Sequence, residues 1–178
     1  MEIGLISKEK LYPIVIILYD GSKFSYLYSF WVTDDNYDFL INRDGNICCF
    51  KNLSNSNKFL EYFEIQASFT DKELDNSLFI CNISEVLFQI ENLYQVNNAW
   101  LLDSINFLLD CLNTISYSNK NEYKKILGDF ADHLTFNLNY EDFFIKIHSK
   151  EKVLNSLYWL WGLISSKIRV IYFSKTKV

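Results

Sequence analysis

The hydrophobic period of the chain changes along its length, and this change limits the folds that the sequence can adopt. From Phe24 to Val32, large apolar side chains fall on every second residue, as in a strand that buries one face. From Leu101 to Ile115 they recur every three or four residues, as in a helix that buries one stripe. Strands followed by helices predict an α+β fold rather than alternating βαβ units.

The first fifty residues predict an N-terminal antiparallel β-meander. The Asp44-Gly45 step between two apolar runs is a strong sequence signal for a tight hairpin turn. Four strands are expected, at residues 12–19, 24–32, 37–42 and 47–51.

The rest of the chain, 52–178, is expected to be mainly helical and to pack against the meander in a single domain, 1–178. Helices are predicted from Ser54 to residue 63, from Asn82, which has Glu85 in capping-box spacing, over 99–115 and 119–134, and after Ser149. Residues 66–76 fit a loop, 78–81 a short strand, 140–148 either strand or helix, and 168–174 a final strand.

No motif in the sequence is typical of an enzyme active site, so we expect a protein that is not an enzyme. The two histidines, His133 and His148, are too far apart for a metal-ligand motif, and no cofactor or metal is expected. Asp129 and His133 lie four residues apart on one helix, which fits a surface pair better than a proton-transfer or metal site. The five glycines are scattered and build no phosphate-binding loop.

The four cysteines predict a reducing compartment. Cys48, Cys49, Cys81 and Cys111 contain no C-x-x-C spacing and fit buried, unpaired thiols. The N-terminal residues lack the pattern of a secretory signal, and no apolar run reaches the roughly 20 residues of a membrane span. We therefore expect a cytoplasmic protein without a membrane partner.

Charge is distributed unevenly along the chain, whose formal net charge is −5. Residues 34–142 hold 18 acidic and 7 basic residues, whereas 143–178 hold one acidic and seven basic residues. An acidic surface of this kind repels nucleic acid and attracts cationic partners. A solvated acidic surface without any partner explains the same pattern.

One stretch resembles the toxin-immunity proteins of bacterial contact-dependent growth inhibition systems. Tyr37–Phe50 followed by Ser54–Phe63 is similar to the strand, D-G turn, strand and helix of several such proteins, over less than a fifth of the chain. The resemblance implies a non-enzymatic inhibitor that binds a cognate toxin domain, often a basic nuclease, and occludes its active site.

If so, exposed acidic residues on turns and helix faces are the expected toxin-binding positions. These are Asp34, Asp35, Asp38, Asp44, Glu61, Glu64, Asp71, Glu73, Asp75, Asp103 and Asp110. Two alternatives stay open: a small cytosolic hydrolase or transferase without a legible motif, and an adaptor or scaffold protein that uses the aromatic C-terminal helix around Tyr158-Trp159.

Overall fold

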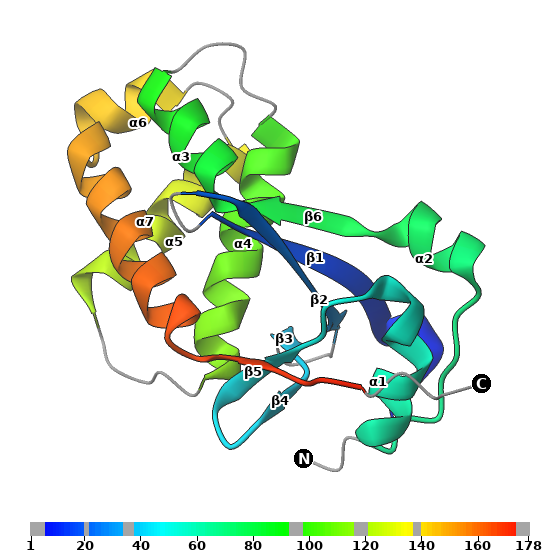
Figure 1. Ribbon diagram of the computed structural model, residues 1–178. Coiled ribbons are helices and arrows are strands. Elements are labelled where there is room, and N and C mark those ends of the chain that lie inside the picture. The colour runs from blue at the N-terminus through cyan, green and yellow to red at the C-terminus, as the bar shows by residue number, and fades with distance from the viewer. Residues whose placement is uncertain are drawn as a thin grey trace. The chain divides into compact units, whose positions relative to one another are not determined.

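The computed structural model describes residues 6–19, 22–33, 38–92, 98–115, 121–136 and 140–173 (Figure 1). The protein has the predicted α+β fold, with a strand-rich N-terminal part and a helical C-terminal part. The chain divides into two compact units, Met1–Cys81 with Ile168–Val178, and Asn82–Lys167. The expectation of a single domain stays a prediction.

The helices and strands follow one another in an order that largely matches the sequence periodicity. In chain order they are η2 (Lys8–Lys10), β1 (Leu11–Tyr19), β2 (Phe24–Val32), β3 (Phe39–Leu40), β4 (Asn42–Arg43), β5 (Asn46–Cys49), η3 (Leu53–Asn55), α1 (Ser56–Tyr62), α2 (Asp71–Ser77), β6 (Phe79–Asn82), α3 (Ile83–Asn92), α4 (Asn98–Thr114), α5 (Glu122–Phe136), α6 (Tyr140–Lys146), α7 (Lys150–Ser165) and β7 (Ile168–Val170).

The predicted meander forms two sheets instead of one. β1 and β2 pair antiparallel over nine residues each, and the first sheet has the order β3-β2-β1-β6. The expected third strand is interrupted at Ile41, so β4 and β5 form a separate sheet in the order β4-β5-β7. β7 pairs parallel with β5, which confirms a C-terminal strand, although a shorter one than predicted.

The hairpin between β4 and β5 has the turn that its sequence predicts. Arg43 pairs with Asn46, which leaves Asp44-Gly45 as a two-residue loop. Asp44 has φ 56° and Gly45 has φ 71°. A turn with two left-handed residues suits the right-handed twist of the flanking strands, and glycine adopts this conformation without steric cost.

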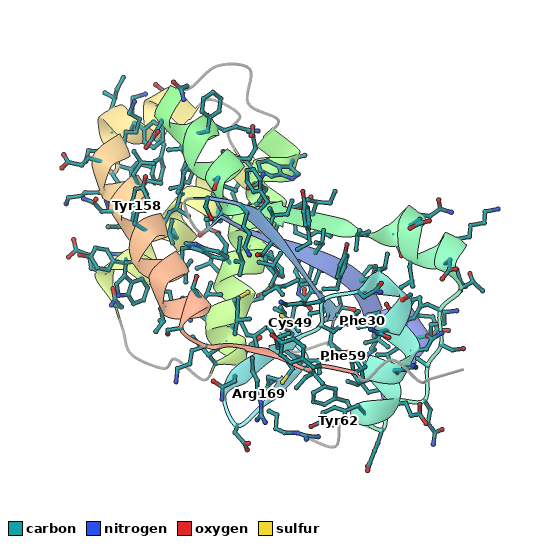
Figure 2. All side chains as sticks on the ribbon, in the orientation of Figure 1. Phe30, Cys49, Phe59, Tyr62, Tyr158 and Arg169 are labelled. Carbon is teal, nitrogen blue, oxygen red and sulfur yellow. The ribbon has the colours of Figure 1, made fainter. Side chains whose placement is uncertain are left out.

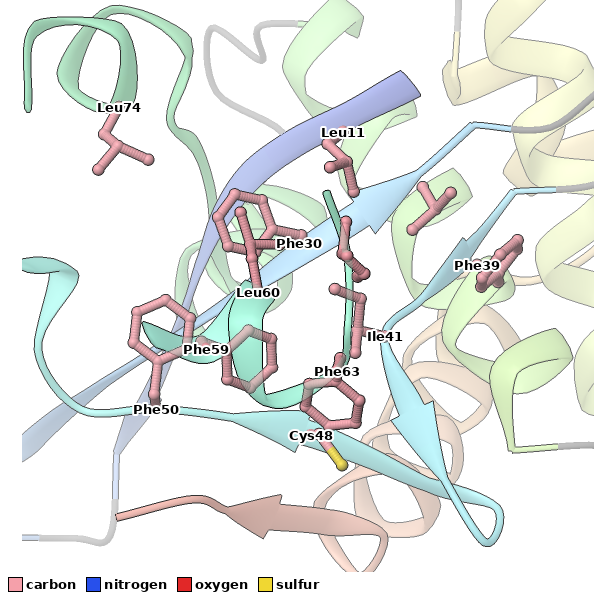
Figure 3. Packing of buried hydrophobic residues seen from close by; sticks show 12 residues of the cluster. Leu11, Phe30, Phe39, Ile41, Cys48, Phe50, Phe59, Leu60, Phe63 and Leu74 are labelled. Atoms are coloured by element: carbon pink, nitrogen blue, oxygen red, sulfur yellow. The ribbon is translucent and has the colours of Figure 1, made fainter. Parts of the chain in front are cut away.

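The core of the first unit is a cluster of phenylalanines from the two sheets and α1 (Figure 3). Phe59 of α1 is fully buried, and its ring centroid lies 4.6 Å from that of Phe50 and 4.9 Å from that of Phe63. Phe30 of β2 lies 6.3 Å from Phe59, so β2 contributes to the same cluster. The buried face predicted for residues 24–32 is therefore confirmed at Phe30 and Val32 only, because Phe24 and Tyr26 on the same face are 53% and 52% exposed.

Two helical predictions in the first unit need correction. Residues 66–76 are not a loop throughout, because α2 occupies Asp71–Ser77. Thr70 and Glu73 form a capping box at its N-terminus, which satisfies backbone N–H groups that such a short polar helix would otherwise leave unpaired. The helix expected from Ser54 begins instead as η3, capped by Asn52, and continues as α1.

The second unit is built from α3 to α7, and α7 contacts α3, α4 and α5. The predicted apolar stripe of α4 is confirmed, since Leu101, Ile105, Leu108 and Leu112 are all buried. Ser149 caps α7 by accepting a hydrogen bond from the Lys152 backbone N–H, as expected. The ambiguous segment 140–148 contains helix α6.

Candidate functional site

The candidate toxin-binding residues lie in both units, so each set is described by itself. Asp34 and Asp35 lie outside the described residues. In the first unit, Asp44, Glu61, Glu64, Asp71, Glu73 and Asp75 are exposed and Asp38 is half-buried. In the second unit, Asp103 is exposed and Asp110 is half-buried on α4.

Four of these residues, Glu61, Glu64, Asp71 and Asp75, lie on α1, α2 and the segment between the helices, and we call them the α1–α2 carboxylates. Asn57 ties this segment to α1, because its side chain donates to the Phe69 carbonyl at 3.0 Å and accepts from the Phe69 N–H at 2.8 Å. Within the described residues, none of the four carboxylates makes a hydrogen bond or an ion pair with a cation. Residues 56–77 hold five acidic residues against Lys58 and Lys72, so this segment has a net charge of −3.

Glu64 stands out because its backbone has φ 59°, in the left-handed region where glycine is favoured. It follows α1 at a helix C-terminus in which the Ile65 N–H donates to the Leu60 carbonyl and the Glu64 N–H to the Glu61 carbonyl. This arrangement usually has glycine at the position of Glu64. A glutamate at this position costs stability relative to glycine. We therefore treat its carboxylate as a candidate binding group.

Glu73 differs from the α1–α2 carboxylates because it is engaged within the fold. Its carboxylate accepts from the Thr70 N–H at 2.8 Å, from the Thr70 hydroxyl at 3.0 Å and from Lys8 Nζ at 2.8 Å. These hydrogen bonds, with that from Lys8 the largest contribution, lower the pKa of Glu73 to about 2. Glu73 therefore stabilises the start of α2 and its contact with η2.

Replacing Glu73 with glutamine is expected to make the free energy of unfolding less dependent on pH between pH 4.5 and pH 2. The folded-state pKa lies below the ordinary value of 4.5, so the stabilisation is present above pH 4.5 and is lost as the pH falls towards 2. Urea unfolding between pH 7 and pH 2 should show a larger loss of unfolding free energy in the wild type than in Glu73→Gln, which keeps only the smaller loss from other carboxylates such as Glu9. Parallel profiles for the two proteins would contradict this role.

The two acidic residues of α4 share one helical stripe, as predicted. Asp103 makes no ion pair within the described residues, and Asn106 and Asn113 lie on the same exposed side. Lys124 of α5 donates to Asn113 Oδ1 at 3.3 Å. The stripe is polar and mostly exposed, which suits a binding surface better than a proton-transfer site.

The predicted pairing of Asp129 with His133 is wrong, because Asp129 pairs with His148 instead. Asp129 Oδ2 lies 3.0 Å from Nε2 of His148, which precedes α7, while the His133 ring packs at 5.2 Å from that of Phe143. Because residues 19 positions apart meet through tertiary packing, the helical spacing could not reveal the contact. The pair connects α5 to the start of α7.

The cysteines behave as predicted within the described structure. All four are buried and form no disulfide. Burial raises the pKa of the Cys81 thiol to about 12 and raises those of Cys48 and Cys49. These thiols stay protonated and pack as small apolar groups.

Two structural features bear on the enzyme alternative. Among the described residues, no group of three or more His, Cys, Asp or Glu side chains is arranged to hold a metal ion. A surface cavity of about 440 Å³ is lined by Asn121, Glu122, Lys124 and Lys125. This described lining offers one carboxylate, two lysines and no histidine.

The comparisons with known proteins give information on the fold and none on the function. No family model matches the sequence, and no curated protein matches it. The chain is similar in structure to the C-terminal domain of SatS, solved in complex with bromine, with a TM-score of 0.57 and 12% sequence identity. The match covers 91% of this chain and 94% of that domain, and at this identity it shows a shared fold alone.

In the part of the chain that the structure describes, no helix has the length and apolar character needed to cross a membrane.

Proposed function

We propose that this protein is a cytoplasmic immunity protein that binds a cognate toxin domain and neutralises it without catalysis. The observation that carries the proposal is the α1–α2 carboxylate set, four exposed acidic side chains without a cationic partner in the described structure. Such a surface attracts a basic protein over long range and aligns it before contact. A toxin domain with a basic active-site surface is the partner that fits this charge.

Several neighbouring carboxylates support this proposal better than one would. Like charges held close together destabilise the free protein by mutual repulsion, and a cationic partner relieves that repulsion on binding. Asp44, at the exposed tip of the β4–β5 hairpin, adds further negative charge to the same unit. Glu73 is excluded from the expected contact set because Lys8 and Thr70 already engage its carboxylate.

Co-expression with a toxin tests the proposal directly. The reading frame beside this gene is first inspected for a C-terminal toxin domain, which is then expressed in a sensitive host as the probe; a neighbouring frame without such a domain would count against the proposal. We expect growth to be restored only when this protein reaches the same molar amount as the toxin, because an inhibitor that occludes a site acts stoichiometrically. Protection at a small fraction of that amount would favour the enzyme alternative, and absence of protection would contradict the proposal.

Glu64→Gly separates the binding role of this residue from its structural role. Glycine removes the strain of the left-handed backbone, so the free energy of unfolding should stay equal or rise by up to about 1 kcal/mol. The same change removes one α1–α2 carboxylate and should slow association with the toxin domain. Urea unfolding and stopped-flow binding measure the two effects, and a variant that lost stability while binding normally would refute the assignment.

The scaffold alternative has one specific observation in its favour. On α7, Tyr158 is 53% exposed, and its hydroxyl lies 3.4 Å from Glu91 Oε1. Trp159 beside it is half-buried and packs 5.4 Å from the Tyr123 ring. Analytical ultracentrifugation distinguishes the two proposals, since a scaffold that assembles through α7 should form oligomers that Tyr158→Asp dissociates.

A further inference from the structure

Both arginines of this chain lie on the small sheet β4-β5-β7. The sequence contains only Arg43 and Arg169 among its 17 basic Lys and Arg residues. Arg43 pairs with Asn46 across the β4–β5 hairpin, and Arg169 of β7 pairs with Cys48 of β5. Directly paired residues point to the same side of a sheet, and so do Asn46 and Cys48, which are two residues apart. The two guanidinium groups are therefore on one sheet face.

The guanidinium group of Arg43 is held in a fixed orientation. Its Nη1 donates to the Tyr62 hydroxyl at 2.8 Å, and its Cζ lies 4.7 Å from the centroid of the Tyr62 ring and 5.0 Å from that of Phe63. The Tyr62 ring is itself packed edge-on by Phe63 at 5.0 Å and by Phe173 at 6.3 Å. Stacking on two rings orients the planar fork while most of its five N–H donors stay available.

Neither arginine is neutralised by a carboxylate in the described structure. Among the described residues, the Arg43 side chain hydrogen-bonds to Tyr62 alone, and the exposed side chain of Arg169 (labelled in Figure 2) makes no hydrogen bond or ion pair. Both cations act on the Cys48 thiol between them: burial raises the pKa of that thiol, and the charges of Arg169 and Arg43 oppose the increase. Both guanidinium groups are thus within electrostatic reach of one point on the sheet.

We propose that Arg43 and Arg169 form a binding site for a dianionic phosphate group, either free phosphate or a phosphate monoester. Planar guanidinium groups bind phosphate oxygens in bidentate fashion, and two of them match a dianion with three terminal oxygens better than a single carboxylate. A nucleic acid fits less well, because a chain with net charge −5 repels a long polyanion more than one compact phosphate group. The site is independent of the toxin partner, so it stands or fails separately from the proposed function.

The two arginines give a direct spectroscopic readout, because the chain has only two arginine Nε–Hε signals. The full-length ¹⁵N-labelled protein is titrated at constant ionic strength with inorganic phosphate and, separately, with a short phosphoserine peptide. Both signals should move together and yield one dissociation constant. Tighter binding of the peptide would assign the group to a phosphorylated partner, and tighter binding of inorganic phosphate would assign it to free phosphate.

The variants test whether the guanidinium forks or mere positive charge bind the ligand. Arg169→Gln and Arg169→Lys should each weaken phosphate binding about 10-fold or more, since both lose a charge-assisted bidentate pair. Lys51→Gln removes one positive charge from the same unit and should leave the affinity within about twofold. Equal weakening by Lys51→Gln and Arg169→Gln would overturn the site, as would shifts that chloride reproduces or that involve one arginine alone.

Discussion

Phe59→Ala is expected to lower the free energy of unfolding by about 3–5 kcal/mol. Phe59 is fully buried and packs against Phe30 of β2, Phe50 directly after β5 and Phe63 at the C-cap of α1 (Figure 3). Truncation removes the ring contacts and leaves a cavity that the surrounding aromatic rings fill only in part. Urea unfolding followed by tryptophan fluorescence measures the loss.

Phe88→Ala is the matched control for that substitution. Phe88 on α3 is 58% exposed, so the same truncation should change the free energy of unfolding by no more than about 0.5 kcal/mol. Equal effects of the two substitutions would show that the phenylalanine cluster is not the main core of the first unit. Because Phe59 also positions α1, its loss should reduce toxin binding in proportion to the unfolded fraction.

Reversing the four α1–α2 carboxylates together is expected to weaken binding of the cognate toxin domain by at least ~100-fold. Each change to lysine replaces an attraction with a repulsion, and about 0.7 kcal/mol for each side chain accounts for a ~100-fold loss. Surface plasmon resonance with the immobilised toxin domain measures the affinity. Circular dichroism should show a folded protein, since all four side chains are exposed.

A second reversal controls for net charge. Glu85, Glu122, Asp132 and Glu151 are also exposed on helices, but they lie in the second unit. Their replacement with lysine changes the net charge by the same amount and should weaken binding by no more than about 10-fold, through the long-range field alone. Similar losses in the two variants would mean that total charge, and no particular surface, determines binding.

Local signals in the sequence predicted most of the regular structure. The Asp44-Gly45 turn, the stripe of α4 and the Ser149 cap depend on neighbours within a few residues, and each is confirmed. The same approach missed α2, although Thr70 and Glu73 have the spacing of a capping box. The charged composition of that segment obscured the signal, because only Leu74 in it is buried.

Contacts between distant residues could not be predicted in this way. β7 pairs with β5 across about 120 residues, and the Asp129–His148 and Arg43–Tyr62 contacts depend on how elements pack. For the candidate site, the acidic residues were recognisable from composition. Sequence could not show which of them are free to bind a partner. The structure shows that Glu73 is bonded to Lys8 and Thr70, while the α1–α2 carboxylates are unpaired within the described residues.

The dependence of the association rate on ionic strength tests the central claim most directly. Raising the ionic strength from about 0.01 M to about 1 M shortens the screening length from ~30 Å to ~3 Å. Stopped-flow mixing of this protein with the cognate toxin domain should then show a rate that falls at least ~10-fold, whereas the variant reversed at the α1–α2 carboxylates should associate slowly at every salt concentration. Identical rates and identical salt dependence for the wild type and the reversed variant would contradict the account.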